Sequence, residues 1–342
     1  MITKPSIASS DHEGRGDQEL GRPSSGMFSV GARRPKVSVV TPSYNQAKYL
    51  EETIVSVLDQ SYPGLEYVIM DGGSADGSVD IIRKYADRLS YWVSEPDAGQ
   101  ADAINKGIAC TTGDIVAYLN SDDVYLPDAV ASAVATFQAD SELSIVHGDA
   151  LLVDSTGKVI GRRRGHECDF LESFLDLTNP IVQPSTFVRR KALEEVDGLD
   201  TSFHMLMDYD LWARIALRGM KIRHIRVELS LFRVHDESKT RSKVVAFAEE
   251  RRKLVEKCLA DPSLAARLLP HRKQLYAVAH LHLASAYWLD GQSRLARDHY
   301  RRAVSAVPRL VVSRRGASLL MRFVLRRRSF RSRLAERGDL GN

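Results

Sequence analysis

Cysteine is scarce in this sequence, whose 342 residues contain only Cys110, Cys168 and Cys258. No two of them form a C-x-x-C pair, which argues against a zinc cluster. An odd number of cysteines without the spacing of a disulfide framework fits a reducing compartment. We therefore expect a cytoplasmic protein.

Long apolar runs are also missing. The longest uncharged apolar stretch, residues 275–289, is shorter than the roughly 20 residues that a membrane-spanning helix needs, and it carries His280 and His282. The N-terminus lacks a basic start followed by an apolar run, so no secretory signal is expected. Membrane contact is expected only at a surface, as a peripheral protein on the inner face of the membrane.

A strong excess of one charge is absent from most of the chain. The formal net charge is +4, yet residues 309–342 hold ten arginines against Glu336 and Asp339. This tail is therefore +8, and residues 1–308 are −4. Because the positive charge is local, it does not predict a nucleic-acid partner. The basic amphipathic sequence at 319–331 could instead lie on an anionic membrane, and a solvated or disordered end is the alternative.

An alternation of strands and helices begins after the first 34 residues. Residues 1–34 are rich in Ser, Gly and charge, so we expect them to be disordered. Short apolar runs then alternate with segments of helical spacing. Strands are predicted at 37–40, 65–70, 92–94 and 115–119, and helices at 49–60, 76–85 and 101–110. This pattern predicts an α/β fold in which helices cover both faces of a mostly parallel sheet.

The pattern becomes helical from about residue 244. Side chains between Leu283 and Pro308 are spaced like one tetratricopeptide-type helical hairpin. A single copy cannot form a solenoid, so a packing appendage is expected, with a partner-binding platform as the alternative. We therefore divide the chain into the segment 1–34, an α/β domain at 35–243, a helical extension at 244–308 and a basic tail at 309–342.

Polar motifs follow three of the predicted strands, at the sheet edge where open α/β folds bind ligands. Asp122 and Asp123 follow the strand at 115–119, and such a pair suits Mg²⁺ or Mn²⁺ that also binds phosphate oxygens. Helix capping is the alternative for this pair. Asp71 precedes two glycines and could accept the imide N–H of a uracil, or form an Asp-Gly turn. Residues 41–45 offer polar groups beside a helix start, where simple N-capping is the alternative.

Two further positions could carry chemistry. Asp208 and Asp210 stand in the first turn of a predicted helix, where an acid could serve as general base for an acceptor hydroxyl. Acids are also common there for helix stability alone. His235 lies in a polar stretch, and both a structural and a ligand role stay open for it.

Together these residues resemble the family 2 glycosyltransferases, which have the nucleotide-sugar-binding GT-A (Rossmann-like) fold. The resemblance covers about residues 36–240 and rests on six motifs in the right order. They are residues 39–45, 71–78, 95–107, 119–123, 208–212 and 233–238. The sequence contains no Gln-x-x-Arg-Trp motif, which argues against a processive polysaccharide synthase.

The resemblance implies a role for each matching residue. The residues implied in the nucleotide pocket are Thr41, Pro42, Tyr44, Asn45, Asp71 and Asp102. Asp122 would lie at the ribose or the metal, Asp123 would be the principal metal ligand, and His235 would lie near the metal and the diphosphate. Asp208 matches the catalytic base, and Gln183 and Trp212 fall on the acceptor side. The cofactor implied is Mg²⁺ or Mn²⁺.

The predicted function is inverting transfer of a sugar from a nucleoside-diphosphate donor to a hydroxyl of a glycan or lipid-linked acceptor. The donor is expected to be UDP-linked, and the setting to be surface polysaccharide biosynthesis. A nucleotidyltransferase is one alternative, disfavoured because residues 41–45 contain no glycine for a phosphate loop. A non-catalytic sugar- or partner-binding module is the other. The presence together of Asp71, Asp122, Asp123 and Asp208 disfavours it.

Overall fold

The computed structural model describes residues 34–167, 169–235, 243–313 and 315–321. The predictions for residues 1–33 and for the tail after Met321 lie outside these ranges. Within them, no helix is both long and apolar enough to cross a membrane.

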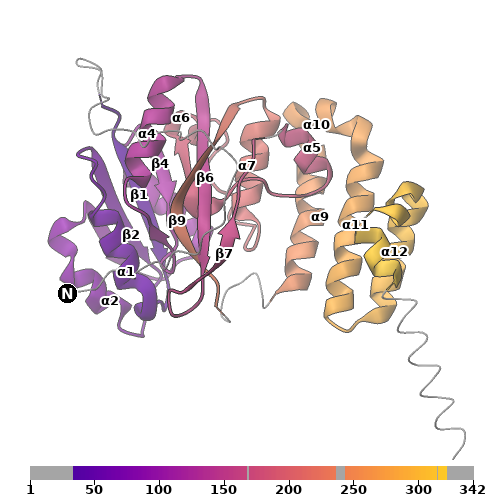
Figure 1. The fold of residues 1–342 in the computed structure, drawn as a ribbon, viewed down its shortest axis with the longest axis horizontal. Helices are drawn as coiled ribbons and strands as arrows, with labels where there is room; N and C mark the ends of the chain where they lie inside the picture. Colours follow the sequence, from indigo (N-terminus) through magenta and orange to yellow (C-terminus); the bar gives the residue numbers. More distant parts are fainter. Residues whose placement is uncertain (1–33, 168, 236–242, 314, 322–342) are drawn as a thin grey trace, which may run out of the picture. The chain divides into compact units, whose positions relative to one another are not determined.

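Four strands and three helices alternate along the first part of the chain, as predicted (Figure 1). The strands are β1 (Val37–Ser43), β2 (Leu65–Asp71), β3 (Tyr91–Ser94) and β4 (Ile115–Tyr118). The helices are α1 (Ala47–Leu58), α2 (Ser78–Lys84) and α3 (Gln100–Ala109), with the short 3-10 helix η1 (Ala86–Arg88) after α2. The strand β1 continues further than predicted, into the polar motif at 41–45.

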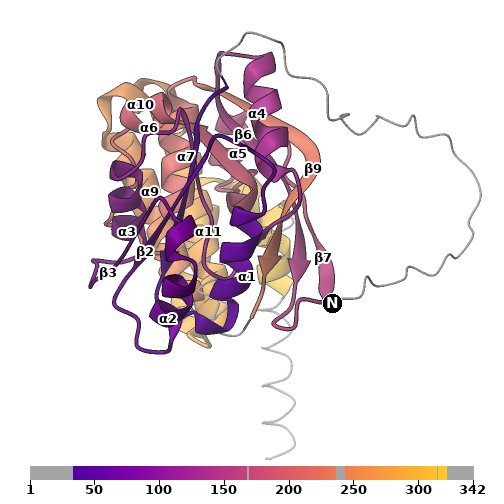
Figure 2. The ribbon, with the colours of Figure 1, turned by 90° about the vertical axis from the view of Figure 1, so that its left-hand side faces the viewer.

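These four strands are parallel and lie in the order β3-β2-β1-β4. Val39 belongs to the same hydrophobic cluster as Leu50 of α1, on one face of the sheet. Val40 belongs to a second cluster with Ile104 of α3. The helices α1 and α3 lie on opposite faces of the sheet (Figure 2). Since successive side chains of a strand point to opposite faces, a strand covered on both faces needs an unbroken apolar run.

The second half of the sheet is mixed. Its strands are β5 (Val124–Tyr125), β6 (Leu143–Val153), β7 (Val159–Arg163), β8 (Thr186–Arg189) and β9 (Lys221–Arg233). Only β6 and β9 pair in parallel, whereas β8 is antiparallel to β4 and to β6, and β5 and β7 are antiparallel to β9 and β6. The predicted parallel pairing is therefore present among β1 to β4 and between β6 and β9, and the other pairings of this sheet are antiparallel. Short connections such as residues 154–158, between β6 and β7, allow antiparallel pairing without a crossover helix.

The helix α7 (Met207–Leu217) is buried around almost its whole circumference. It lies in the cluster that also contains Ile104 and Tyr118 of the sheet domain. The remaining helices of this half are α4 (Ala129–Ala139), α5 (Phe170–Leu175), α6 (Arg190–Glu194) and the 3-10 helix η2 (Gln183–Ser185).

The predicted helical extension is present and continues the same core. Its helices are α9 (Val244–Ala260), α10 (Pro262–Leu268), η3 (Leu269–His271), α11 (Arg272–Leu289), α12 (Ser293–Ala306) and η4 (Pro308–Val312). The helices α11 and α12 form the predicted hairpin, and α9 packs on α11 (Figure 1). Leu254, Leu264 and Leu275 belong to the hydrophobic cluster that contains Trp212 of α7. The sheet domain and the extension therefore share one core across residue 243.

Candidate active site at the carboxyl ends of the strands

The carboxyl ends of β1, β2 and β4 bring the predicted polar motifs to one edge of the sheet. Ser43 at the end of β1 is the register partner of Asp71 at the end of β2. The Gly72 N–H donates to the Ser43 carbonyl over 2.8 Å, which continues the pairing into the following loops. The loop after β4 starts at the same edge, because β4 is the parallel neighbour of β1 on its other side.

The loop after β1 divides the predicted nucleotide residues into buried and exposed ones. Thr41 and Pro42 are buried, and the Thr41 hydroxyl lies 3.0 Å from the Tyr67 hydroxyl. Tyr44 is 62% exposed. Asn45 has a positive φ of 52°, and its Oδ1 accepts from the Ala75 N–H over 3.0 Å. In this structure Thr41 and Pro42 support the loop from behind, and Tyr44 and Asn45 are the members that a ligand can reach.

Asp71 organises its own loop. Its carboxylate accepts from the N–H groups of Gly73 (3.2 Å) and Ser74 (2.9 Å) and from the hydroxyls of Ser74 (2.6 Å) and Ser94 (2.7 Å). Three of these donors bond to Oδ2 and only the Ser74 hydroxyl bonds to Oδ1. The Asp-Gly turn, the alternative reading of this motif, is thus formed, and Oδ1 keeps a lone pair that a nucleobase N–H could use.

A second acid lies beside this loop and was missed from the sequence. Asp97 Oδ2 lies 2.7 Å from the position that a Cβ atom on Gly72 would occupy, and the Tyr44 ring is 3.3 Å from the same position. Gly72 therefore leaves room for the Asp97 carboxylate beside Tyr44. The glycine pair after Asp71 was the available signal. Nearby, Asp102 accepts from the Ala98 N–H (3.0 Å) and pairs with Lys106 (3.0 Å), so it fixes the start of α3.

The two acids after β4 have different surroundings. Asp123 is 1% exposed, and its carboxylate accepts from the backbone N–H of Arg233 over 3.0 Å. Burial raises the pKa of the Asp123 carboxyl well above its usual range, and the neighbouring Asp122 adds to this effect. The Asp122 carboxylate is partly exposed and lies 3.0 Å from His235 Nε2. The structure thus brings Asp122 and His235 together and places Asp123 behind them.

Arg233 fixes the geometry of the pair formed by Asp122 and His235. Its buried guanidinium donates to the Asp122 carbonyl (3.0 Å) and to the Glu52 carboxylate (2.6 Å), and lies 4.7 Å from the Tyr49 ring centre. The same ring lies 5.2 Å from the His235 ring. The imidazole is therefore held against Tyr49 with one nitrogen facing Asp122.

Three amide side chains form a hydrogen-bonded row from the start of α3, through the loop after β4, to η2. Gln100 Nε2 donates to Asn120 Oδ1 over 2.6 Å, and Asn120 Nδ2 donates to Gln183 Oε1 over 3.1 Å. Gln183 Nε2 in turn donates to the Tyr118 carbonyl over 2.9 Å. Gln183, the predicted acceptor-side residue, is thus connected to the strand end that carries Asp122. Gln100 and Asn120 were not assigned a role from the sequence.

Asp208 stands at the second position of α7 and is partly buried. Asn179 Nδ2 donates to its Oδ2 over 3.5 Å. Burial raises the pKa of the Asp208 carboxyl. The positive charges of Arg163 and Arg251 act in the opposite direction and do not reverse the shift. A partly buried carboxylate with a raised pKa is a suitable proton acceptor.

Trp212 is 1% exposed, and its ring stacks on Tyr118 with the centroids 6.5 Å apart. Trp212 lies one turn after Asp208 on a helix that is buried almost all round, and its ring offers little surface to an acceptor in this structure. An acceptor-side role for Trp212 therefore stays a prediction. Trp212 packs α7 against the end of β4.

The donor set fits a divalent cation that is bound largely by its substrate. One carboxylate and one imidazole face each other at Asp122 and His235, and Mn²⁺ accepts both ligand types. Among the residues that the structure describes, no group of three or more His, Cys, Asp or Glu side chains is arranged to hold a metal ion. Such a site suits a cation that takes its other ligands from phosphate oxygens and water.

Comparison with known proteins shows the family of this chain. The sequence profile described as Glycosyl transferase family 2 matches residues 38–197. An uncharacterized glycosyltransferase of Mycobacterium tuberculosis is 33% identical over 187 residues, which cover 54% of this chain and 70% of that protein. An uncharacterized glycosyltransferase of Nostoc is 30% identical over 237 residues, which cover 64% of this chain and 70% of that protein.

Solved structures share the fold. The S. aureus protein TarS, residues 1–349, superposes with a TM-score of 0.59 at 20% identity, over 81% of this chain and 82% of that one. A mannosyltransferase of Pyrobaculum calidifontis, solved with GDP-Man and Mn²⁺, gives a TM-score of 0.58 at 22% identity, over 86% of this chain and 80% of that one. From the ordered motifs, the profile match and the relatives, we conclude that this chain belongs to glycosyltransferase family 2.

Proposed function

We propose that the protein transfers a sugar, with inversion, from a UDP-linked donor to a hydroxyl of a glycan or lipid-linked acceptor in surface polysaccharide assembly. Two comparisons support the donor and the setting. TarS has been solved in complex with UDP-GlcNAc, with a TM-score of 0.56 to this chain. A Bacillus subtilis relative assigned to teichuronic acid biosynthesis is 44% identical over 98 residues, which cover 28% of this chain and 39% of that protein.

On the donor side, Tyr44, Asn45 and Asp97 would contact the nucleotide, because these polar side chains lie on the loops beyond β1 and β3. Asp122 and His235 would hold Mg²⁺ or Mn²⁺ together with the diphosphate. This assignment takes Asp122 as the principal metal ligand in place of Asp123, since the Asp123 carboxylate is buried against the Arg233 N–H. A bound cation would offset the negative charge that develops on the departing diphosphate.

On the acceptor side, Asp208 would accept the proton of the attacking hydroxyl. The acceptor oxygen forms the new bond to the anomeric carbon while the bond to the diphosphate oxygen breaks. A single displacement of this kind inverts the anomeric configuration. Gln183 and Asn120, which are hydrogen-bonded to each other beside the end of β4, would orient the sugar by hydrogen bonding.

The observation that carries the proposal is the shared location of the two chemical groups. The ring of Trp212, one turn after Asp208, stacks on Tyr118 at the end of β4, and the Asp122–His235 pair follows the same strand. A base at Asp208 and a diphosphate site at Asp122 and His235 would therefore both adjoin the end of β4. A non-catalytic binding module has no need of a partly buried acid at this place.

The direct test is the substitution Asp208→Asn, assayed by release of UDP from UDP-GlcNAc with Mn²⁺ and by UDP binding. General-base catalysis contributes about 10²- to 10⁴-fold, so turnover should fall by that factor while UDP affinity stays unchanged. Asp128→Asn is the matched control, because Asp128 is exposed and makes no capping bond. Wild-type turnover in Asp208→Asn would remove Asp208 from the catalytic role.

A further inference from the structure

The helix that carries Asp208 begins without a capping side chain of its own. Its N-cap residue is Leu206, which forms no side-chain cap, although the first N–H groups of a helix need acceptors. The helical extension supplies an acceptor next to this start. Glu250 of α9 accepts from the backbone N–H groups of His204 (2.9 Å), Met205 (2.8 Å) and Leu206 (2.8 Å).

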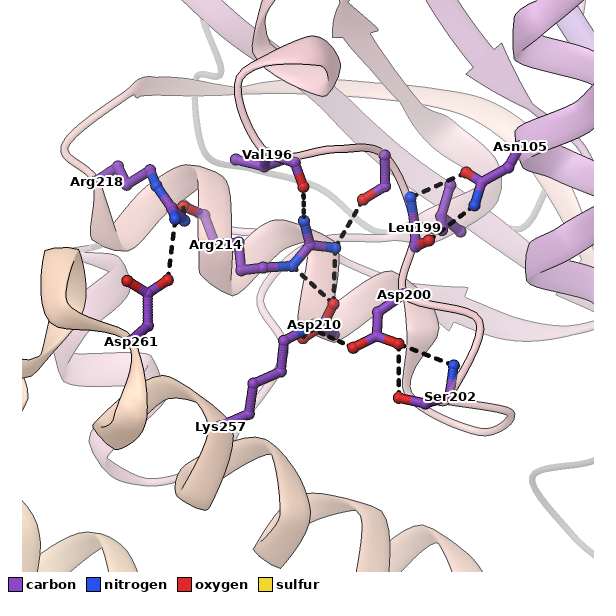
Figure 3. A network of polar contacts seen from close by, with 11 residues as sticks. Asn105, Val196, Leu199, Asp200, Ser202, Asp210, Arg214, Arg218, Lys257 and Asp261 are labelled. Atoms are coloured by element: carbon purple, nitrogen blue, oxygen red, sulfur yellow. Dashed lines mark hydrogen bonds and ion pairs between the residues drawn. The ribbon is translucent and has the colours of Figure 1, made fainter.

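Two lysines on the same face of α9 hold the same segment. Lys253 and Lys257 follow Glu250 by three and seven residues, a spacing that places all three side chains on one side of the helix. Lys253 Nζ donates to the Ser202 carbonyl over 2.6 Å. Lys257 Nζ donates to Asp200 Oδ2 over 2.7 Å (Figure 3). We call Glu250, Lys253 and Lys257 the α9 clasp.

The clasp also reaches α7 itself. Lys257 Nζ lies 2.7 Å from Oδ1 of Asp210, whose side chain is fully buried, and Arg214 pairs with Oδ2 of the same carboxylate (Figure 3). Arg214 also donates to the carbonyls of Val196 and Gly198. A buried carboxylate that is paired with two cations is costly to break from either side, so this network resists displacement of α7.

The α9 clasp contacts residues 200–206, which lead into α7. The residue just before them, Leu199, is held by α3 of the sheet domain. Asn105 donates to the Leu199 carbonyl over 2.8 Å and accepts from the Leu199 N–H over 3.0 Å (Figure 3). The buried Phe203 ring lies 4.5 Å from Lys253 Nζ and 5.1 Å from Lys257 Nζ. The residues leading into α7 are therefore held by contacts to α3 and to α9.

We infer that the α9 clasp positions the catalytic base, and that Glu250 is a positioning residue for Asp208. The helical extension is then part of the active site and more than a packing appendage. This inference rests on the proposed function. Glu250 bonds to the three residues that end two positions before Asp208, so its loss should let the first turn of α7 shift. A displacement of about 1 Å at a reacting group can cost roughly 100-fold in rate.

The test compares Glu250→Ala and Glu250→Gln with the wild type, using UDP-GlcNAc and Mn²⁺ well below the melting temperature. Turnover is divided by the number of UDP-binding sites, so that unfolded protein does not count. We expect kcat per site to fall roughly 10- to 100-fold in Glu250→Ala, with an unchanged Kd for UDP. The side-chain amide in Glu250→Gln keeps one oxygen, which can accept from at most two of the three N–H groups, so this variant should give an intermediate kcat.

The control is Glu256→Ala, because Glu256 lies on the same helix, is exposed and pairs with Arg252. It should match the wild type. A lower melting temperature in the Glu250 variants with unchanged kcat per site would overturn the inference and leave a purely structural role. A weaker Kd for UDP with unchanged kcat would also overturn it. If the wild type releases no UDP from UDP-GlcNAc, the proposed function fails instead.

Discussion

At the scale of single residues, the chemistry depends on how deeply each carboxylate is buried. Asp208 is partly buried in the first turn of α7, and burial raises the pKa of its carboxyl. Two arginines act to lower this pKa, Arg163 on β7 and Arg251 on α9. The base must be ionised to accept a proton, so activity should be lost as the pH falls through this raised pKa.

Removing one of these arginines should change the pH below which activity is lost. Arg251→Met should raise the pKa of Asp208 further, because it removes a nearby positive charge. The acidic limb of the kcat/KM profile should then shift to higher pH. Arg252→Met is the matched control, since Arg252 is next to Arg251 on α9 and pairs with Glu249 and Glu256. Superimposable profiles for Arg251→Met and the wild type would show that Arg251 does not tune the base.

Substitutions of the adjacent acids should show two different roles, with Asp122 as a metal ligand and Asp123 as a structural group. Asp123→Ala removes the acceptor of the buried Arg233 N–H and should destabilise the metal-free protein by about 1–3 kcal/mol. Asp122→Ala should leave that stability nearly unchanged and abolish the stabilisation by UDP with Mn²⁺. Thermal denaturation with and without these ligands checks both statements. The opposite assignment would follow if Asp123→Ala kept its stability and lost the metal response.

The two acids could be recognised as a motif in the sequence. Which of them binds a metal and which is structural could not be predicted from it. The difference arises from β9, which brings the Arg233 N–H to Asp123 across 110 positions of the chain. No local spacing encodes that contact. Asp97 was missed for a similar reason, because its partner Gly72 lies on a different loop. The burial of Trp212 was missed because α7 is covered on almost every side by elements far away in the sequence.

At the scale of elements, the first four strands and three helices could be predicted because their periodicity is local. The strands β6 to β9 could not be ordered in the same way. Their partners are set by hairpins and by the long β6–β9 pairing, where the hydrophobic pattern does not specify direction. The helices of the extension were predicted from their spacing. Their docking was not, since the clasp contacts join α9 to residues about 45 to 60 positions earlier.

The docking of α9 can be tested through its buried leucine. Leu254→Ala should destabilise the protein by about 2–5 kcal/mol, because Leu254 is fully buried in the core shared with α7. Leu295→Ala on α12 is the control of equal chemistry, since Leu295 is 40% exposed and should cost far less. Urea denaturation of both variants measures the difference. Similar losses in the two would mean that α9 contributes little to the common core.

At the scale of the whole molecule, the extension and the sheet domain behave as one folding unit in this account. The chain from Pro35 on forms a single contact unit, with no division near residue 243. Truncation after Thr240 would expose Trp212, Phe203 and their neighbours to water. We therefore expect such a fragment to lose cooperative unfolding and UDP-GlcNAc turnover together. A stable, fully active fragment of residues 35–240 would contradict the shared core.

The basic tail is a separate matter, because most of it lies outside the described residues. Seven of its ten arginines lie in residues 322–342 and should favour anionic surfaces, with each one worth about 1 kcal/mol when it is near the membrane. Deletion of residues 322–342 should therefore reduce flotation with vesicles that contain phosphatidylglycerol, and neutral vesicles serve as the control. Equal flotation with and without the tail would remove it as a membrane contact.

A metal-dependent nucleoside-diphosphate site at the ends of β1, β2 and β4 can be tested by the melting temperature of the full chain with UDP, GDP, dTDP or CDP, each with and without Mn²⁺. We expect stabilisation by UDP that requires Mn²⁺, reaching about 2.7 kcal/mol when the ligand is at 100 times its Kd. If no diphosphate raises the melting temperature in the presence of Mn²⁺, the proposed donor site is contradicted.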